Sequence, residues 1–130
     1  MKQQKIRGKA GWRTVGRKKV WFRSRWEANV ARYFQYLKQQ GRVRRWEHEP
    51  ETFWFEGIKR GCVSYLPDFR VTWPDGSVSY VEVKGYMDSK SKTKLKRMAK
   101  YFPEVELILI DRDYYKDIER NFMGLIKGWE

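Results

Sequence analysis

The sequence predicts a mixed α/β fold around one sheet, with the element order helix, three strands, helix, strand, helix. Two segments carry apolar residues at helical spacing, and the segments between them are typical of strands separated by turn residues. A short apolar strand after the second helix predicts a crossover onto a parallel neighbour. At 130 residues with 41% hydrophobic content the chain suits one core, so we expect a single domain over residues 23–130 and a basic arm over residues 1–22.

The first predicted helix lies in SRWEANVARYFQYLKQQG, residues 24–41. Ser24 is suited to the N-cap, and Gly41 to the left-handed position that follows a helix. The apolar residues that fall on one face are Trp26, Val30, Phe34 and Leu37.

Later elements follow from the same patterns. The expected elements are an antiparallel meander of strands in residues 44–57, 62–73 and 77–85, a basic amphipathic helix over residues 88–102, the strand VELILI, and a final helix over residues 114–128. We expect VELILI to lie parallel to the third strand, with the basic helix as the crossover.

The loop WPDGS sets the register between the second and third strands, and two interpretations compete. A two-residue Asp75-Gly76 turn would place Asp68 opposite Val83. A three-residue loop over residues 74–76 suits Pro, Asp and Gly at its positions better. Partner numbers then add to 150, and Asp68 faces Glu82.

In that register the third strand turns Val81 and Val83 toward the core, while Glu82 and Lys84 point with Asp68 into a cleft. Directly opposed side chains have Cβ atoms about 5 Å apart, so two carboxylates there repel unless a cation such as Mg²⁺ lies between them. The alternative is a solvated sheet face on which Lys84 pairs with a neighbouring acid. The basic surroundings favour the cation site.

Glu27 has two interpretations. Ser24-Arg25-Trp26-Glu27 fits the S-x-x-E capping box, in which the glutamate only bonds back to the backbone at Ser24. An acid at a helix start could instead extend over the sheet as a third acidic ligand. The first helix by itself favours the capping role.

These residues resemble the PD-(D/E)xK nuclease pattern, through Glu27 on the first helix, Pro67-Asp68 on the second strand and Glu82-Val83-Lys84 on the third. More closely, RSRWE, YLPDF, the glycine-containing hairpin, VEVKG and a lysine-rich helix before PEVELILI resemble the phage endonuclease I family of junction-resolving enzymes. The resemblance runs from about residue 23 to residue 110. Residues 111–130 match nothing in that family.

The resemblance implies a restriction-endonuclease-like αβββαβ core and a homodimer that cuts branched DNA, such as a four-way Holliday junction. It implies catalytic roles for Glu27, Asp68, Glu82 and Lys84. Asp68, Glu82 and the Val83 carbonyl are expected to hold one Mg²⁺, for which Mn²⁺ substitutes, and Glu27 to help hold a second. Lys84 is expected to orient or deprotonate the attacking water.

The net charge of +13, from 29 Lys and Arg against 16 Asp and Glu, independently favours a polyanion as partner. Trp12 and Trp21, in the basic arm, are candidates for base stacking, or for packing against the first helix. The expected DNA-binding residues are Lys90, Lys92, Lys94 and Arg97 of the basic helix, with Arg17, Lys18, Lys19 and Arg23 of the arm.

Other function classes are restricted by what the sequence contains. A single Cys62 and a single His48 exclude an internal disulfide and a Cys/His zinc site, and we interpret His48 as structural. No run approaches membrane-spanning length, so we expect a soluble intracellular protein, in the host cytoplasm if phage-encoded. Two alternatives stay open, a non-catalytic nucleic-acid-binding module and the nuclease subunit of a phage or transposition assembly.

Overall fold

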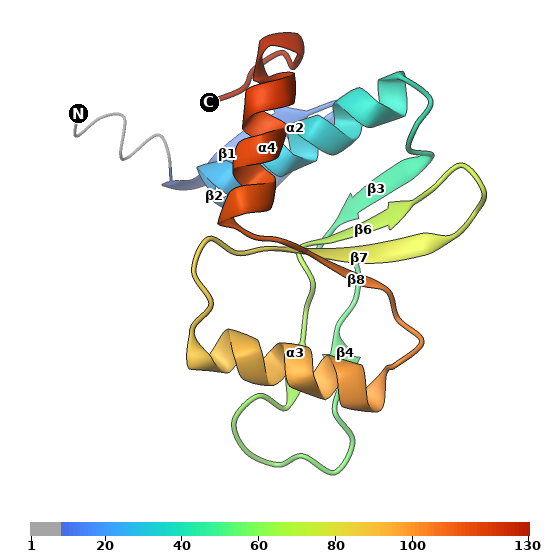
Figure 1. Ribbon diagram of the computed structural model, residues 1–130, viewed down its shortest axis with the longest axis vertical. Coiled ribbons are helices and arrows are strands. Elements are labelled where there is room, and N and C mark those ends of the chain that lie inside the picture. Colours follow the sequence, from blue (N-terminus) through green and yellow to red (C-terminus); the bar gives the residue numbers. More distant parts are fainter. Residues whose placement is uncertain (1–8) are drawn as a thin grey trace.

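The computed structural model of the chain describes residues 9–130 and shows a mixed α and β architecture. The central sheet consists of β3 (Arg45–His48), β6 (Phe69–Thr72), β7 (Val78–Val83) and β8 (Leu107–Ile110), side by side in that order. On one side of it lie α2 (Arg25–Gln39) and α4 (Arg112–Phe122), and on the other lies α3 (Ser89–Tyr101) (Figure 1). The predicted order of helix, three sheet strands, helix, strand and helix is confirmed.

Strand directions and register also agree with the sequence. β3, β6 and β7 form an antiparallel meander, and β8 lies parallel to β7 after the α3 crossover. Phe69 pairs with Val81 and Thr72 with Val78, so partner numbers add to 150. Gly76 adopts a φ of 89°, which is a conformation that glycine accepts without strain. The three-residue loop is therefore the correct interpretation of WPDGS.

Two predicted strands are each divided in the structure. The segment 44–57 splits into β3 and β4 (Phe53–Trp54), and the segment 62–73 splits into β5 (Ser64–Tyr65) and β6. A proline lies in each interruption, where its missing N–H prevents continued pairing. β4 and β5 pair with one another as a separate two-stranded sheet.

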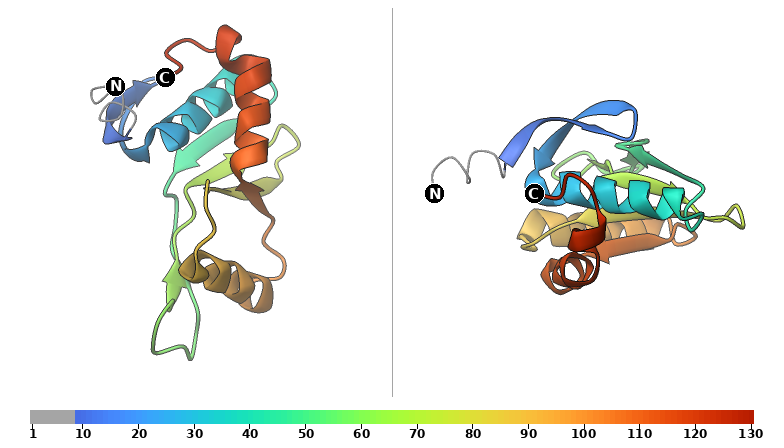
Figure 2. Two further views of the ribbon diagram at one scale, coloured as in Figure 1. Left: turned by 60° about the vertical axis from the view of Figure 1, so that its left-hand side comes forward. Right: turned by 90° about the horizontal axis from the view of Figure 1, so that it is seen from above.

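The prediction of a basic arm is wrong for residues 9–22, and residues 1–8 of that arm lie outside the described residues. β1 (Lys9–Val15) and β2 (Lys18–Ser24) form an antiparallel hairpin that runs beside α2 (Figure 2). Val15 and Phe22 are buried in the core that α2 also fills. Lys18 and Lys19 occupy strand positions between these apolar anchors, and Gly16 makes the turn with a φ of 62°.

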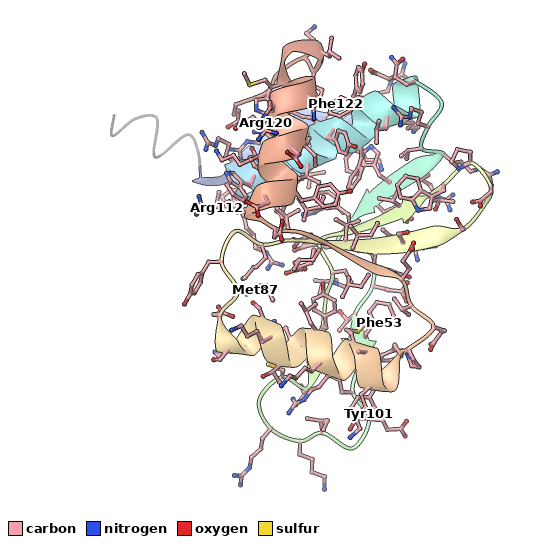
Figure 3. The ribbon with its side chains drawn as sticks, viewed as in Figure 1. Phe53, Met87, Tyr101, Arg112, Arg120 and Phe122 are labelled. Carbon is pink, nitrogen blue, oxygen red and sulfur yellow. The ribbon has the colours of Figure 1, made fainter. Side chains whose placement is uncertain are left out.

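Two apolar clusters hold the layers together on opposite faces of the sheet. The larger lies between the sheet and the pair α2 and α4, and it includes Trp46, Phe69 and Tyr115. The smaller joins α3 to β4 and β5, and Phe53 lies between α3 and the central sheet within it (Figure 3). Met98 is its contribution from α3. The predicted acids gather where β6 begins and β7 ends.

The helix ends follow local side chains. Ser24 caps α2 through its Oγ, and Gly41 follows the helix with a φ of 76°, both as predicted. The final helix begins earlier than expected because Asp111 accepts the Tyr114 N–H, and it ends at Phe122 before a 3₁₀ turn over Met123–Leu125. No helix within residues 9–130 has both the length and the apolar character needed to cross a bilayer.

Candidate active site

A cleft of about 410 Å³ opens where β6 begins, β7 ends and α2 starts. It brings together residues from three segments of the chain, residues 23–27, Asp68 and residues 82–88. The predicted residues that line it are Arg23, Glu27, Asp68, Glu82, Val83 and Lys84. Ser24, Gly85, Tyr86 and Asp88 complete the lining.

Asp68 is the most firmly held of the three acids. Its side chain is almost fully buried, its Oδ2 accepts the Val83 N–H at 2.8 Å, and its carbonyl accepts the Glu49 N–H at 2.8 Å. Burial, followed by the negative charges of Glu82 and Glu27, raises the pKa of the Asp68 carboxyl to about 9. Without a cation, this carboxyl therefore retains its proton at neutral pH.

Glu27 caps its helix and faces the cleft at the same time. Its N–H donates to Ser24 Oγ at 3.1 Å, and its Oε1 accepts the N–H of Arg23 at 2.8 Å, one residue before the position that a capping box uses. Burial opposes ionisation of Glu27, but its polar contacts with His48, Arg23 and Asp68 outweigh the effect of burial and lower its pKa. The two interpretations of Glu27 are thus compatible.

Glu82 receives a hydrogen bond from outside the central sheet. The Tyr65 hydroxyl, on β5, donates to Glu82 Oε1 at 2.8 Å. Burial raises the pKa of Glu82, although the Tyr65 hydrogen bond and the positive charge of Lys84 act in the other direction. Burial also raises the pKa of Tyr65, which keeps its hydroxyl proton available to the carboxylate.

Lys84 follows β7 directly and is half-buried. Its N–H donates to the Ile110 carbonyl at 3.0 Å, so pairing with β8 continues to the edge of the cleft. At the next residue, Gly85, an added Cβ would lie 3.1 Å from the Trp26 ring. A glycine at this position therefore lets the chain pass close beneath the first turn of α2.

The Val83 carbonyl has a particular position at the end of the sheet. Val83 directs its N–H to Asp68, whereas the next N–H, from Lys84, is directed to β8. The N–H and carbonyl of one strand residue point to the same side, so the Val83 carbonyl also points toward β6. In the observed register its partner position is Pro67, which has no N–H to donate. The sheet therefore leaves an oxygen donor beside Asp68.

Two residues that contact the acids of the cleft have roles that the sequence analysis did not assign. Tyr65 was not singled out, and His48 was interpreted as structural. The His48 ring does pack against Phe22 and Phe69, with centroids 4.9 and 5.5 Å away, but its Nε2 lies 3.4 Å from Glu27 Oε1. The contact is long, and Nε2 makes no well-formed hydrogen bond among the described residues. His48 therefore contributes both to packing and to the surroundings of Glu27.

The donor atoms of the cleft suit a hard cation. Carboxylate and carbonyl oxygens are the ligands that Mg²⁺ and Mn²⁺ prefer, and Mg²⁺ keeps several waters in addition to one or two carboxylates. Within residues 9–130 no three His, Cys, Asp or Glu side chains are arranged as a ready-made metal cage. Asp68, Glu82 and the Val83 carbonyl nevertheless fit a partly hydrated Mg²⁺, which needs no third carboxylate.

The predicted DNA-binding residues are distributed over two surfaces, and several make contacts within the protein. Arg23 lines the cleft and pairs with Glu49, and Lys94 of α3 lies near enough for its charge to lower the pKa of Glu82. Arg97 donates to the Cys62 carbonyl at 2.5 Å, and Lys18 donates to the Trp46 carbonyl at 2.7 Å. Arg17, Lys19, Lys90 and Lys92 are exposed.

Comparison with known proteins gave one match. No curated protein and no solved structure matched the chain. Residues 7–117 match a family described as a protein of unknown function, DUF1064. The matched range covers most of the chain and includes every residue that lines the cleft. The chain therefore belongs to the DUF1064 family.

Proposed function

We propose that this protein is a metal-dependent endodeoxyribonuclease. The observation that carries the proposal is the cleft, which is lined by three carboxylates, a lysine and Val83, whose partner position in the register is Pro67. Buried acids at such short range destabilise a fold, so an arrangement of this kind favours a catalytic or cation-binding role over a structural one. A chain of net charge +13 supports a phosphodiester of DNA as the substrate.

The residues have distinct roles in this proposal. Asp68, Glu82 and the Val83 carbonyl would hold Mg²⁺ or Mn²⁺, with Glu27 beside them. The bound cation would supply stabilisation of the negative charge that develops on the phosphoryl oxygens. Lys84, at the rim of the same cleft, would orient the attacking water and accept or relay its proton. Tyr65 would hold the Glu82 carboxylate in place, and Arg23 would bind a flanking phosphate.

We infer a preference for branched DNA, such as a four-way junction, from the resemblance to junction-resolving enzymes together with the position of the basic groups. Arg23, at the end of β2, lines the cleft, and the charge of Lys94 on α3 acts on Glu82. Positive charge contributed by two separate elements near an acidic cleft suits a bent or branched backbone better than one straight groove.

The test is cleavage of supercoiled plasmid and of a labelled four-way junction in Mg²⁺, with EDTA as the metal-free control. Glu82→Gln and Asp68→Asn are expected to reduce cleavage at least about a thousandfold, because each removes a charge on which transition-state stabilisation depends. Both variants are expected to bind DNA as the wild type does. Glu104→Gln, an exposed acid away from the cleft, is the matched control and is expected to cut normally.

Each outcome has a distinct meaning. Paired cuts near the branch would support junction resolution, whereas nicks spread through duplex DNA would indicate a nicking enzyme. Cleavage by Glu82→Gln at the wild-type rate would contradict the assignment of the cleft. Tight binding without cleavage in either Mg²⁺ or Mn²⁺ would instead favour the binding module, or a nuclease subunit that needs a partner protein.

A further inference from the structure

The outer face of the β1–β2 hairpin carries two exposed tryptophans that the fold does not bury. Trp12 and Trp21 are directly paired across the strands, with 61% and 48% of their surface exposed. Their rings meet edge to face, with centroids 5.6 Å apart and planes at 76°. We call the outward-facing residues Trp12, Thr14, Lys19, Trp21 and Arg23 the tryptophan face.

The opposite side of the hairpin provides the anchoring. Phe22 is fully buried, Val15 is nearly so, and Lys18 donates across to the Trp46 carbonyl. Arg13 is hydrogen bonded to the Glu130 carboxylate. The contacts that hold the hairpin against the rest of the protein are therefore made by its inner side. The two exposed rings lie on the outer side of a hairpin that is fixed in position.

The tryptophan face is basic and leads to the cleft. The Lys19 ammonium lies 5.5 Å from the centre of the Trp12 ring, and Arg23, two residues after Trp21, lines the cleft beside Glu27. Residues 9–26 contain no acidic residue. Exposed aromatic rings interleaved with cations are the surface that single-stranded nucleic acid binds, because bases stack on the rings while cations bind the phosphates.

We propose that the tryptophan face binds unpaired nucleotides of a DNA strand whose backbone continues into the cleft. Bases stack on Trp12 and Trp21, and Lys19 and Arg23 bind the adjoining phosphates. Paired bases inside a duplex do not expose their faces to such rings, so the site selects single-stranded segments such as those at branches and flaps. The connection to the cleft rests on the proposed nuclease function, whereas the stacking itself is independent of cleavage.

The experiment measures binding in EDTA to oligothymidylate and to a blunt duplex with the same number of phosphates. The double variant Trp12→Val and Trp21→Val keeps strand-forming residues but removes both rings. We expect it to lose about fivefold or more in oligothymidylate affinity, since one stacked base contributes at least that factor, and to bind the duplex within about twofold of the wild type. Circular dichroism and thermal unfolding verify that the hairpin remains folded.

Two further variants make the result specific. Trp12→Tyr with Trp21→Tyr retains aromatic rings and is expected to keep most of the oligothymidylate affinity. Trp54→Val removes a tryptophan that is 66% exposed on β4 and is expected to change neither affinity. The proposal is overturned if the double valine variant binds oligothymidylate like the wild type, or loses affinity for both DNA forms equally.

These outcomes separate the proposal from that of nuclease activity. Cleavage by wild-type protein together with unchanged binding by the double valine variant would contradict only the proposed stacking site. Selective loss of oligothymidylate binding in a protein that never cuts would contradict only the proposed nuclease activity. Glu82→Gln serves as the internal reference because it changes the cleft and leaves both rings in place.

Discussion

The surroundings of the three cleft carboxylates do not all shift the pKa in the same direction. Glu27 accepts the backbone N–H of Arg23 and lies near the His48 ring, and its ionised form is favoured. Asp68 is buried between two other acids, and its protonated form is favoured. A cation that enters would replace the Asp68 proton. The opposite pKa shifts of Glu27 and Asp68 are therefore consistent with a cation-binding site in which that proton balances part of the negative charge when no metal is bound.

This imbalance predicts that Asp68→Asn stabilises the metal-free protein. A folded-state pKa of about 9 lies above the ordinary value of 3.8, so the folded protein holds a proton that the unfolded chain has released, and stability falls as pH rises between those values. The amide avoids this loss and can still accept the Val83 N–H. We expect its melting temperature in EDTA to exceed that of the wild type by roughly 5 °C at pH 8 and by less at pH 5.

Thermal unfolding in EDTA and in Mg²⁺ measures this effect. Wild-type protein is expected to gain stability when Mg²⁺ is added, and Asp68→Asn is not. Glu104→Gln is expected to behave like the wild type in both buffers. A lower melting temperature for Asp68→Asn at pH 8 would show that the Asp68 carboxylate stabilises the metal-free protein. It would contradict the view that the cleft lacks positive charge to balance its carboxylates.

At this scale the sequence identified the acids but not the residues that surround them. Asp68 and Glu82 could be related because a hairpin loop fixes which strand positions are opposite. His48 pairs with Phe69 between β3 and β6, and no short loop joins these two strands to fix their register. Tyr65 comes from a separate two-stranded sheet. Only tertiary structure brings such side chains to the cleft.

Among the elements, α3 supplies the largest group of lysines, and its two sides are not equivalent. Met98 is the buried residue of this helix. At 100° per residue, Lys90 and Lys94 lie on one flank of Met98, whereas Lys96 and Lys100 lie on the far side. Lys94 also influences Glu82. DNA in the cleft would therefore meet the first pair.

We predict that replacing Lys90 and Lys94 with alanine lowers the salt dependence of DNA affinity. Each lost phosphate contact reduces the slope of log affinity against log salt by about 0.9, so the pair is expected to reduce it by about 1.8. Lys96→Ala with Lys100→Ala removes the same charge and is expected to reduce the slope by less than half as much. Equal effects of the two double variants would mean that α3 acts only through net charge.

Sequence patterns at the element scale predicted the central sheet better than they predicted the β1–β2 hairpin that precedes it in the sequence. Pro, Asp and Gly at residues 74–76 each suit one position of the loop, so the register followed. The β1–β2 hairpin was misinterpreted because lysine and arginine density indicated a polyanion-binding arm and obscured the alternation around Phe22. Charge composition favours a class of partner, but it does not distinguish an arm from a hairpin whose apolar positions are few.

For the whole molecule, Glu130 joins segments from opposite ends of the sequence. Its carboxylate accepts hydrogen bonds from Arg13 of β1 at 2.6 and 2.9 Å and from Arg32 of α2 at 2.8 Å. Its backbone N–H donates to the Asn29 side chain at 3.1 Å. Burial opposes ionisation of Glu130, but the two arginines outweigh it and lower its pKa.

We predict that Glu130→Gln destabilises the protein at pH 7 by about 1 kcal/mol, allowing for solvent screening of a partly exposed group. Because the folded-state pKa lies below the ordinary value of 4.5, this contribution is complete above that pH and is lost as pH falls through the folded-state value. Denaturant unfolding at pH 7 and at successively lower pH is expected to show a difference that shrinks in acid. A difference that persists in acid would assign the effect to packing.

The Tyr65–Glu82 hydrogen bond has a consequence beyond the cleft itself. Tyr65 is buried in the smaller apolar cluster with Phe53, Phe55 and Met98, whereas Glu82 stands on the central sheet. A substitution deep in that cluster would shift the tyrosine ring and withdraw its hydroxyl from the carboxylate, without touching any residue of the cleft. The packing beneath α3 and the position of the Glu82 carboxylate are therefore linked, and substitutions that preserve volume in the cluster would keep this hydrogen bond only when they also preserve the angle of one ring.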